Sequence, residues 1–237
     1  MKYQTTFKRF EMKYLLTKEE KEEVLSVLKT KMKLDKYGRT TIRNIYFDTD
    51  TYRLIRRSIE KPVYKEKLRL RSYQSVKPED EIFVELKKKY KSVVYKRRLS
   101  LSERQTMDAF LKNTPLPVES QIAKEIEYFR EFYQDLKPKV FLSYEREAYY
   151  ALDGSDFRVT FDENILYRNH HLSLGVEVFG TPLLNEQMTL MEIKTSGGIP
   201  LWMSHVLTKH QIYKTSFSKY GFAYQNMYKE KGGILYV

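Results

Sequence analysis

The sequence predicts an α+β fold, with about eight antiparallel strands in one sheet and helices packed outside it. Three observations lead to this prediction. Charged side chains recur at every second residue of several segments, capping-box patterns mark helix starts, and most neighbouring strand-like segments lie close together in the chain. Because residues i, i+2 and i+4 of a strand point to one face, the alternation gives each such segment one charged and one more apolar face.

The expected strands cover residues 5–14, 40–48, 62–73, 81–90, 92–101, 139–150, 156–162 and 188–195. Short separations between most of them are typical of antiparallel hairpins. The segment YKEKLRLRSY shows the alternation best, because Lys65, Lys67, Arg69 and Arg71 share one face and leucines take the other. The stretch 168–187 is expected to form an irregular connection.

Two capping boxes predict helix starts. Thr17 with Glu20 precedes a helix through about 18–29, and Ser102 with Gln105 precedes a short helix that ends near Asn113.

Three further helices are expected. Apolar residues at i, i+4, i+7 and i+11, from Ile122 to Tyr133, indicate one of them. Pro200 begins another, and a last short helix follows Tyr220. The helices therefore alternate with the strands rather than forming a separate part of the chain.

Composition favours one well-packed domain with an anionic partner. The chain has 237 residues, 14% of them aromatic, and a net charge of +12 from 43 basic and 31 acidic residues. Such a charge indicates nucleic acid, anionic lipid or phosphorylated small molecules as partners. The absence of Cys excludes disulfides, thiolate catalysis and Cys-based zinc sites.

No membrane helix or leader is expected. No apolar run approaches the roughly 20 residues of a membrane helix, and the opening MKYQTTFKRFEMKY lacks the apolar core of a signal peptide. We therefore expect a cytoplasmic protein.

The alternating charges have a plain alternative interpretation, a solvated sheet face with cross-strand salt bridges. Against it, the cations of YKEKLRLRSY stand side by side and repel each other unless an anion lies among them. The pattern also recurs on several strands. If the charged faces point at each other, they line a basic tunnel that holds a few carboxylates, which indicates a polyanion bound with a metal.

The motifs RFEMKYLL, IRNIYFDTD, KLRLRSY, VELKKKY, VVYKRR, YEREAY, FRVTFD, LMEIKTSGGIPLW and FSKYGF follow one another between about residues 7 and 225. Their order resembles the VTC domain, the polyphosphate polymerase domain of the triphosphate tunnel metalloenzyme superfamily, which is related to CYTH phosphatases and cyclases. The resemblance implies a single domain over residues 1–237, an eight-stranded antiparallel β tunnel barrel with helices outside. It also implies transfer of the terminal phosphoryl group of ATP or another triphosphate to inorganic polyphosphate, with Mn²⁺ or Mg²⁺.

Matched motif by motif, the resemblance assigns phosphate binding to Lys13, Arg69, Arg71, Lys87, Lys96, Arg146, Arg158 and Lys219. It places all of these except Lys96 in the catalytic set. Glu192 is the expected metal ligand and Glu11 a second one. Arg9 stands where CYTH-type enzymes have the first acid of Glu-x-Glu-x-Lys, which favours the VTC branch.

The alternative function is a non-catalytic polyanion-binding module for polyphosphate or RNA. Tyrosines beside basic strands can stack single-stranded bases, but here Leu and Val occupy the faces opposite the cations, so no specific nucleic acid is expected. Related eukaryotic domains work in membrane complexes, which leaves a separate membrane partner open. Asp48 and Asp50 could coordinate a metal, although a turn at a strand end is favoured, and Asp162 is placed similarly.

Overall fold

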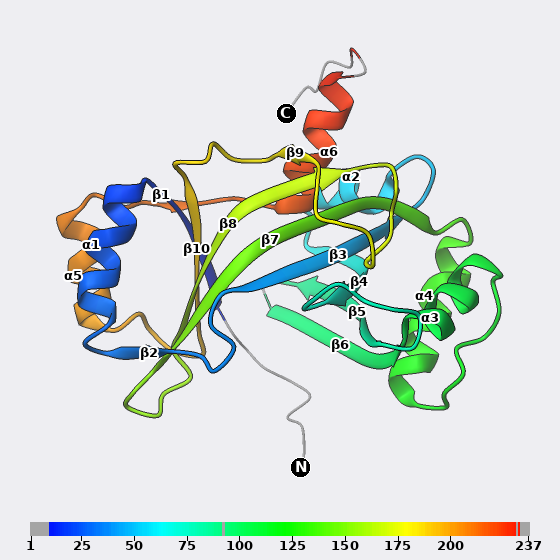
Figure 1. Cartoon of the computed structure of the whole chain (residues 1–237), viewed down its shortest axis with the longest axis horizontal. Coiled ribbons are helices and arrows are strands. Elements are labelled where there is room, and N and C mark those ends of the chain that lie inside the picture. The colour runs from blue at the N-terminus through cyan, green and yellow to red at the C-terminus, as the bar shows by residue number, and fades with distance from the viewer. Residues whose placement is uncertain (1–9, 92, 231, 233–237) are drawn as a thin grey trace.

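The computed structural model of the chain describes residues 10–91, 93–230 and 232. Its main feature is an antiparallel sheet of eleven strands covered by helices (Figure 1). The strands are β1 Phe10–Leu16, β2 Met32–Leu34, β3 Thr40–Asp48, β4 Tyr64–Ser72, β5 Glu81–Tyr90, β6 Val93–Ser102, β7 Lys137–Ala151, β8 Arg158–Arg168, β9 Thr181–Pro182, β10 Thr189–Thr195 and β11 Lys214–Thr215.

The helices are α1 Lys18–Leu28, α2 Arg53–Ile59, α3 Glu103–Leu111, α4 Gln121–Tyr133, α5 Leu201–Lys209 and α6 Lys219–Glu230. Both predicted capping boxes are present, at Thr17 before α1 and at Ser102 before α3. The α+β class is therefore confirmed.

The sheet is curled but not closed. Its order is β11-β1-β10-β8-β7-β3-β4-β5-β6, with β2 beside β7 and β9 beside β8. Among the described residues, no pairing joins β11 to β6, so the expected closed barrel of eight strands is not confirmed. The two ends nevertheless approach each other, because Glu11 Oε2 of β1 lies 2.9 Å from Lys87 Nζ of β5. The face that carries these two side chains is called the inner face below.

The eight expected strands correspond to β1, β3, β4, β5, β6, β7, β8 and β10, with shifted ends. Residues 5–9 of the first lie outside the described residues. Strand β8 continues six residues beyond the expected end at Asp162, because ion pairs neutralise its polar run and a register shift in β7 accommodates it. Short strands β2, β9 and β11 were not predicted, and β9 lies inside the expected irregular connection.

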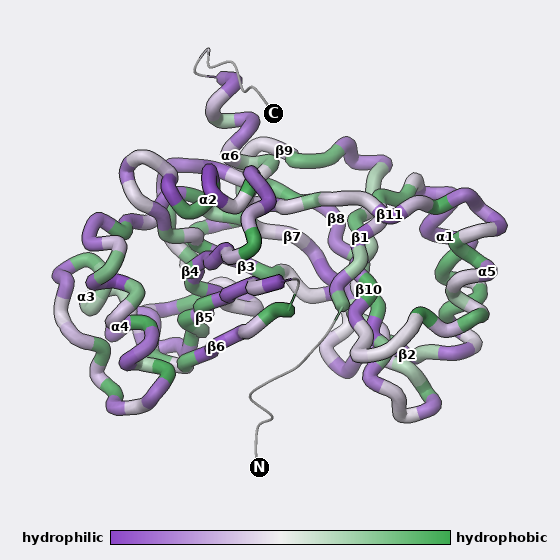
Figure 2. Tube along the Cα trace, turned by 180° about the vertical axis from the view of Figure 1, so that it is seen from behind, coloured by the Kyte–Doolittle hydropathy of each residue, from purple (hydrophilic) through white to green (hydrophobic). Residues whose placement is uncertain are grey.

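Apolar side chains gather in three clusters that join the sheet to its helices. One packs α3 and α4 against β4, β5 and β6, and a second packs α1 and α5 against β1, β8 and β10. Figures 1 and 2 show these helix pairs at opposite ends of the molecule. The third cluster places α2 and α6 over part of β3 and β7, where Tyr220 stacks on Tyr46 with ring centroids 4.7 Å apart. The helices thus cover apolar surface and leave a polar stretch of the inner face between them.

Among the described residues, no helix has the length and apolarity that crossing a membrane requires.

Helix α2 was not predicted, and Asp48 explains how it forms. The Asp48 carboxylate is fully buried and accepts hydrogen bonds from the amides of Leu54 and Ile55, at 2.8 and 3.0 Å. It also accepts one from the Tyr220 hydroxyl at 2.9 Å, which ties α6 to the same point. Asp48 therefore caps a helix and anchors a second one, and this is the strand-end role that the sequence favours for it.

We expect Asp48→Ala to lower the free energy of unfolding by about 3 kcal/mol, because it leaves buried donors without an acceptor. Asp50→Ala is the matched control, since Asp50 makes only exposed ion pairs with Lys137 and Lys139. Urea unfolding followed by circular dichroism measures both. Equal stabilities for the two variants would contradict the anchoring role.

Candidate functional site

The inner face brings together charged residues from seven strands and from the start of α6. Cross-strand register explains the grouping, because cations and carboxylates lie directly opposite each other at several positions. Lys13 opposes Glu192, and Arg146 opposes Asp162. Toward the other end of the strand order, Glu85 lies between Arg69 and Arg98 on the same face. The same period-2 pattern that predicts charged faces thus also builds ion pairs across them.

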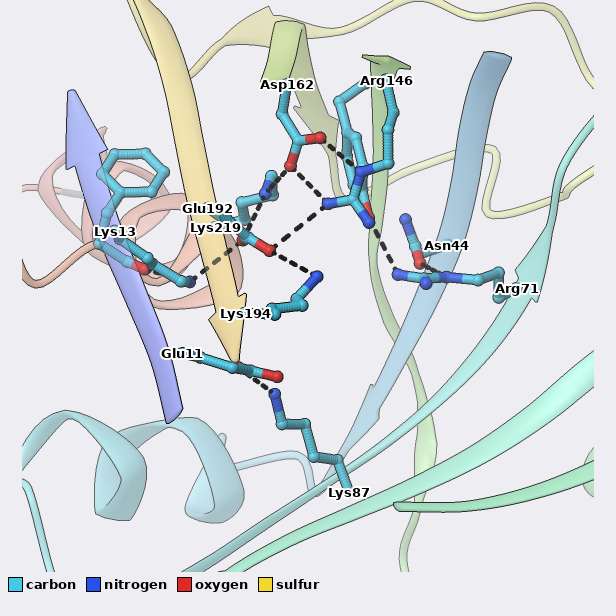
Figure 3. Close-up of polar contacts among 12 residues, drawn as sticks. Glu11, Lys13, Asn44, Arg71, Lys87, Arg146, Asp162, Glu192, Lys194 and Lys219 are labelled. Carbon is cyan, nitrogen blue, oxygen red and sulfur yellow. Dashed lines mark hydrogen bonds and ion pairs between the residues drawn. The ribbon is translucent and has the colours of Figure 1, made fainter. Parts of the chain in front are cut away.

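Two buried carboxylates, Asp162 and Glu192, lie among four cations (Figure 3). The six residues Lys13, Arg146, Asp162, Glu192, Lys194 and Lys219 are called the Glu192 cluster. Arg146 grips Asp162 with two parallel hydrogen bonds of 2.6 and 2.7 Å. Lys219, the first residue of α6, donates to Asp162 at 2.5 Å and to Glu192 at 3.3 Å. The start of α6 is therefore held against the inner face by charge.

Glu192 is surrounded more loosely. Its oxygens lie 3.2 Å from Lys194 Nζ, 3.5 Å from Lys13 Nζ and 3.6 Å from an Arg146 nitrogen. Lys13 also donates to the Phe217 carbonyl at 2.6 Å. These longer ion pairs leave Glu192 available to another positive group.

Both carboxyls of this cluster are held in the charged form. Burial alone would raise the pKa of each, but neighbouring cations outweigh it. The pKa of Asp162 lies below its usual range because of Arg146 and Lys219. The pKa of Glu192 is well below its usual range, chiefly because of Lys219 and Lys13. The cluster therefore offers two ionised carboxylates at neutral pH.

The Glu85 cluster lies on β4, β5 and β6. Its centre is the Glu85 carboxylate, which is 1% exposed and contacts four cations. The closest nitrogen–oxygen distances are 2.8 Å to Arg69, 3.8 Å to Arg71, 2.5 Å to Lys96 and 2.6 Å to Arg98. Burial raises the pKa of Glu85, but these cations outweigh burial and lower it. One carboxylate thus offsets part of the repulsion among four cations.

Arg71 connects the two clusters. It donates to Asn44 Oδ1 at 2.9 Å and to the Tyr144 hydroxyl at 2.9 Å. Burial raises the pKa of Tyr144, yet Arg71, Arg146 and Lys219 lower it overall. The inner face therefore forms one continuous, mainly cationic surface.

A row of opposed lysines lies beside the Glu85 cluster. Lys67 faces Lys87, which faces Lys96, and Lys65 faces Lys89 in the next row. Lys87 pairs with Glu11 and Lys96 with Glu85. Within the described part of the chain Lys67 has no acidic partner and donates only to Ser218 Oγ, at 3.0 Å.

Burial lowers the pKa of Lys67 well below its usual value, and Lys13, Lys65 and Lys87 add to the effect. Like charges directly opposite one another destabilise a sheet. This row is therefore the place on the inner face where an anion is most needed.

Most expected site residues come together here. The two clusters and the lysine row contain Glu11, Lys13, Arg69, Arg71, Lys87, Lys96, Arg146, Glu192 and Lys219. Arg158 is exposed at the start of β8, where it lines a surface pocket with Tyr150 and Lys33. It has no ion pair with the described members of either cluster.

The assigned set of site residues did not include several inner-face residues that the sequence had only placed on charged faces or, for Asp162, weighed as a possible metal ligand. These are Lys67, Tyr144, Lys194, Arg98, Glu85 and Asp162. The period-2 pattern contains them, since Glu85 precedes Lys87 by two residues and Asp162 follows Thr160 by two. The pattern does not say that these two carboxylates become the centres of the clusters.

The side chains around Glu192 include few further donors for a metal ion. Among the described residues, no group of three or more His, Asp or Glu side chains could hold a metal ion. Divalent metals bound with phosphates often take only one or two protein carboxylates, however. Glu192 is ionised and loosely paired, and the buried Thr160 hydroxyl opposite it has no hydrogen-bond partner among the described residues. The donor set therefore fits a metal that arrives with phosphates.

The family VTC domain matches residues 8–228. The chain belongs to this family, and the resemblance found in its motifs is confirmed. No curated protein matches the chain.

Solved structures share the fold at low identity. A "putative adenylate cyclase" from Bacillus halodurans superposes with a TM-score of 0.57 at 17% identity, over 91% of this chain and 96% of that one. A "putative adenylyl cyclase" from Hippeastrum with a dominant triphosphatase activity gives 0.53 at 15% identity, over 95% and 96%. A third, from Vibrio parahaemolyticus, gives 0.51 at 11%, over 93% and 99%. At these identities the likeness concerns the fold alone.

We expect Glu85→Gln to destabilise the protein by about 3–5 kcal/mol, because it leaves buried cations without their counter-charge. Inorganic triphosphate should then raise the melting temperature more in this variant than in the unchanged protein, since it replaces the missing negative charge. Glu79→Gln is the control, because Glu79 pairs with Arg104 in an exposed position. Equal triphosphate shifts in Glu85→Gln and the unchanged protein would contradict anion binding beside Glu85.

Proposed function

We propose that the inner face binds a triphosphate or polyphosphate chain and that the protein transfers the terminal phosphoryl group of a nucleoside triphosphate, such as ATP, to inorganic polyphosphate. The observation that carries this proposal is the row Lys67, Lys87 and Lys96, in which cations oppose one another directly. A bare phosphate chain has closely spaced charges that match such a row. Membership of the VTC-domain family supports the same function.

The residue types suit phosphoryl transfer. The transition state spreads negative charge over the equatorial, attacking and leaving oxygens, so positioned cations stabilise it. Arg binds phosphate through two parallel hydrogen bonds and Lys through a compact charge. The acceptor phosphate oxygen is already an anion at neutral pH, so the reaction requires no strong general base. The proposed phosphate contacts are Lys13, Arg69, Arg71, Lys87, Lys96, Arg146, Arg158 and Lys219.

Glu192 would hold the divalent metal, Mn²⁺ or Mg²⁺, with Glu11 as the proposed second ligand. When bound, the metal supplies charge neutralisation between donor and acceptor phosphates. Lys219 and Arg146 keep Glu192 ionised and fix its position from the side of Asp162.

The wider assignments belong to the same proposal. The eight long strands act as one tunnel domain over residues 1–237, and the protein works in the cytoplasm. Several moderate contacts along the inner face would allow a long anion to slide, which a single tight clamp would prevent.

One observation favours a second candidate, a module that binds polyphosphate without turnover. Each of the four inner-face carboxylates, Glu11, Glu85, Asp162 and Glu192, is in an ion pair with a protein cation. A metal at Glu192 has to compete with these cations. Incubation with ATP and Mn²⁺, followed by a gel stained for polyphosphate, separates the two candidates: a ladder supports the polymerase, whereas tight binding without product supports the module.

Glu192→Gln should abolish metal-dependent turnover and leave triphosphate binding nearly intact. The change removes the proposed metal ligand but keeps the cations that grip the ground-state phosphates. Turnover is followed with Mn²⁺ and binding by calorimetry without metal. Full activity in this variant would refute the metal role.

Lys67→Ala should weaken triphosphate binding by about tenfold. The Lys67 amino group has no carboxylate partner among the described residues, so a bound phosphate does not have to displace one. Lys88→Ala is the control on the opposite face of the neighbouring strand, where Lys88 lies near Glu125. Fluorescence anisotropy with labelled polyphosphate gives both affinities. An RNA oligonucleotide of equal charge should compete poorly, and efficient displacement by RNA would favour nucleic-acid binding instead.

A further inference from the structure

Three side chains with planar groups meet on the inner face at the edge of the Glu85 cluster. They are Tyr73, which follows the last residue of β4, Phe83 of β5 and Arg98 of β6, and together they are called the Arg98 platform. The Arg98 guanidinium carbon lies 4.3 Å from the centre of the Phe83 ring. Tyr73 meets Phe83 edge to face, with ring centroids 5.7 Å apart. Strands β5 and β6 and the residue that follows β4 thus contribute one planar group each.

The guanidinium of Arg98 is held in place from several sides. Its Nε donates to Glu85 Oε1 at 2.8 Å, and its Nη2 donates to the Tyr73 hydroxyl at 3.0 Å. The Phe83 ring supports one face of it. The Arg98 side chain is still 37% exposed and Tyr73 is 41% exposed. The guanidinium plane of Arg98 therefore has a fixed orientation and remains accessible to solvent.

Phe83 does not have the position of a core residue. It lies on the inner face, in the same alternation as Glu85 and Lys87, and opposes Arg71. None of the three apolar clusters of the described residues includes it. An aromatic ring on a charged face, outside the core and under a guanidinium, requires another explanation than packing.

Planar groups of this kind bind nucleobases. Aromatic rings and guanidinium planes stack bases of any sequence, because every base has a π face. The Phe83 ring adds a cation–π contact that helps to hold the planar guanidinium in place. A bare phosphate chain can bind the guanidinium of Arg98 but has no planar group to stack on it.

The platform lies at the right place for the nucleoside end of a triphosphate. Phe83 and Lys87 are four residues apart on β5, which corresponds to about 13 Å along the strand. The Glu85 cluster lies between them, and its members Arg69 and Lys96 point to the same face. A phosphate chain that starts at the platform therefore runs over the Glu85 cluster toward the lysine row.

We propose that the Arg98 platform is the base-stacking site for the nucleoside triphosphate, which sets the direction in which the donor lies on the inner face. This inference rests on the proposed function. The base stacks on Arg98 and Tyr73, and the terminal phosphate points toward Lys67 and Lys87. Stacking recognises a base without reading its edges, so triphosphates of different bases are accepted.

The test compares two ligands in each variant. Dissociation constants for ATP and for inorganic triphosphate are measured by calorimetry, without metal, in the unchanged protein, Tyr73→Ala and Phe83→Leu. We expect each variant to lose about tenfold in affinity for ATP while its affinity for inorganic triphosphate changes less than about twofold. Tyr95→Ala is the control, because Tyr95 is a similarly exposed tyrosine on the opposite face of β6.

The ratio of the two constants is determined within one protein sample, so a partly unfolded variant loses sites without changing the ratio. An unchanged ratio in both variants overturns the stacking site and leaves phosphate binding standing. If both dissociation constants rise equally, so that the ratio stays the same, Tyr73 acts only by holding Arg98 for phosphate. Failure of the unchanged protein to bind either ligand overturns the proposed function and this inference together.

A Tyr73→Trp variant gives an independent reading. Its fluorescence should be quenched by ATP and not by inorganic triphosphate, with the single natural tryptophan, Trp202, as the background measured in the unchanged protein. Equal responses to the two ligands would contradict stacking at this position.

Discussion

Ion pairing between carboxylates and cations on the inner face is the constraint on which the rest of the structure depends. The sheet turns its apolar face outward to the helices and its charged face inward, the reverse of an ordinary half-exposed sheet. Buried charges are tolerated only when they are paired and hydrogen-bonded. Glu85, Asp162 and Glu192 each meet this condition through cations on neighbouring strands. Lys219 extends the same pairing to α6, so charge also positions a helix.

The pairing is incomplete, and this gives the inner face its chemistry. Cations outnumber carboxylates there, and Lys67 has no acidic partner among the described residues. A concave surface with one dominant sign of charge concentrates ions of the opposite sign. The excess is local, so it points to a bound anion more directly than the net charge of +12 does. Family membership and the charge arrangement therefore lead to the same class of ligand.

Much of the fold was predictable because local patterns determine it. Alternation predicted the charged faces of six of the eight expected strands, and two capping boxes predicted α1 and α3. Helix α2 was not predictable in this way, since Asp48, several residues upstream, caps it and Tyr52 before it adopts a left-handed backbone with φ of 56°. The three short strands follow from pairing with distant segments and leave little trace in the sequence.

The sequence predicted most residues of the candidate site, but it did not predict which of them contact one another. Alternation places Glu85 and Asp162 on charged faces, but the register between neighbouring strands makes them the centres of clusters, and the sequence alone does not give that register. Whether the inner face holds a phosphate chain is tested most directly by a crystal structure with inorganic triphosphate. The account predicts phosphates between the Glu85 and Glu192 clusters, in contact with Lys67 and Lys87. Phosphates bound only on the outer surface, with the inner face unchanged, would contradict it.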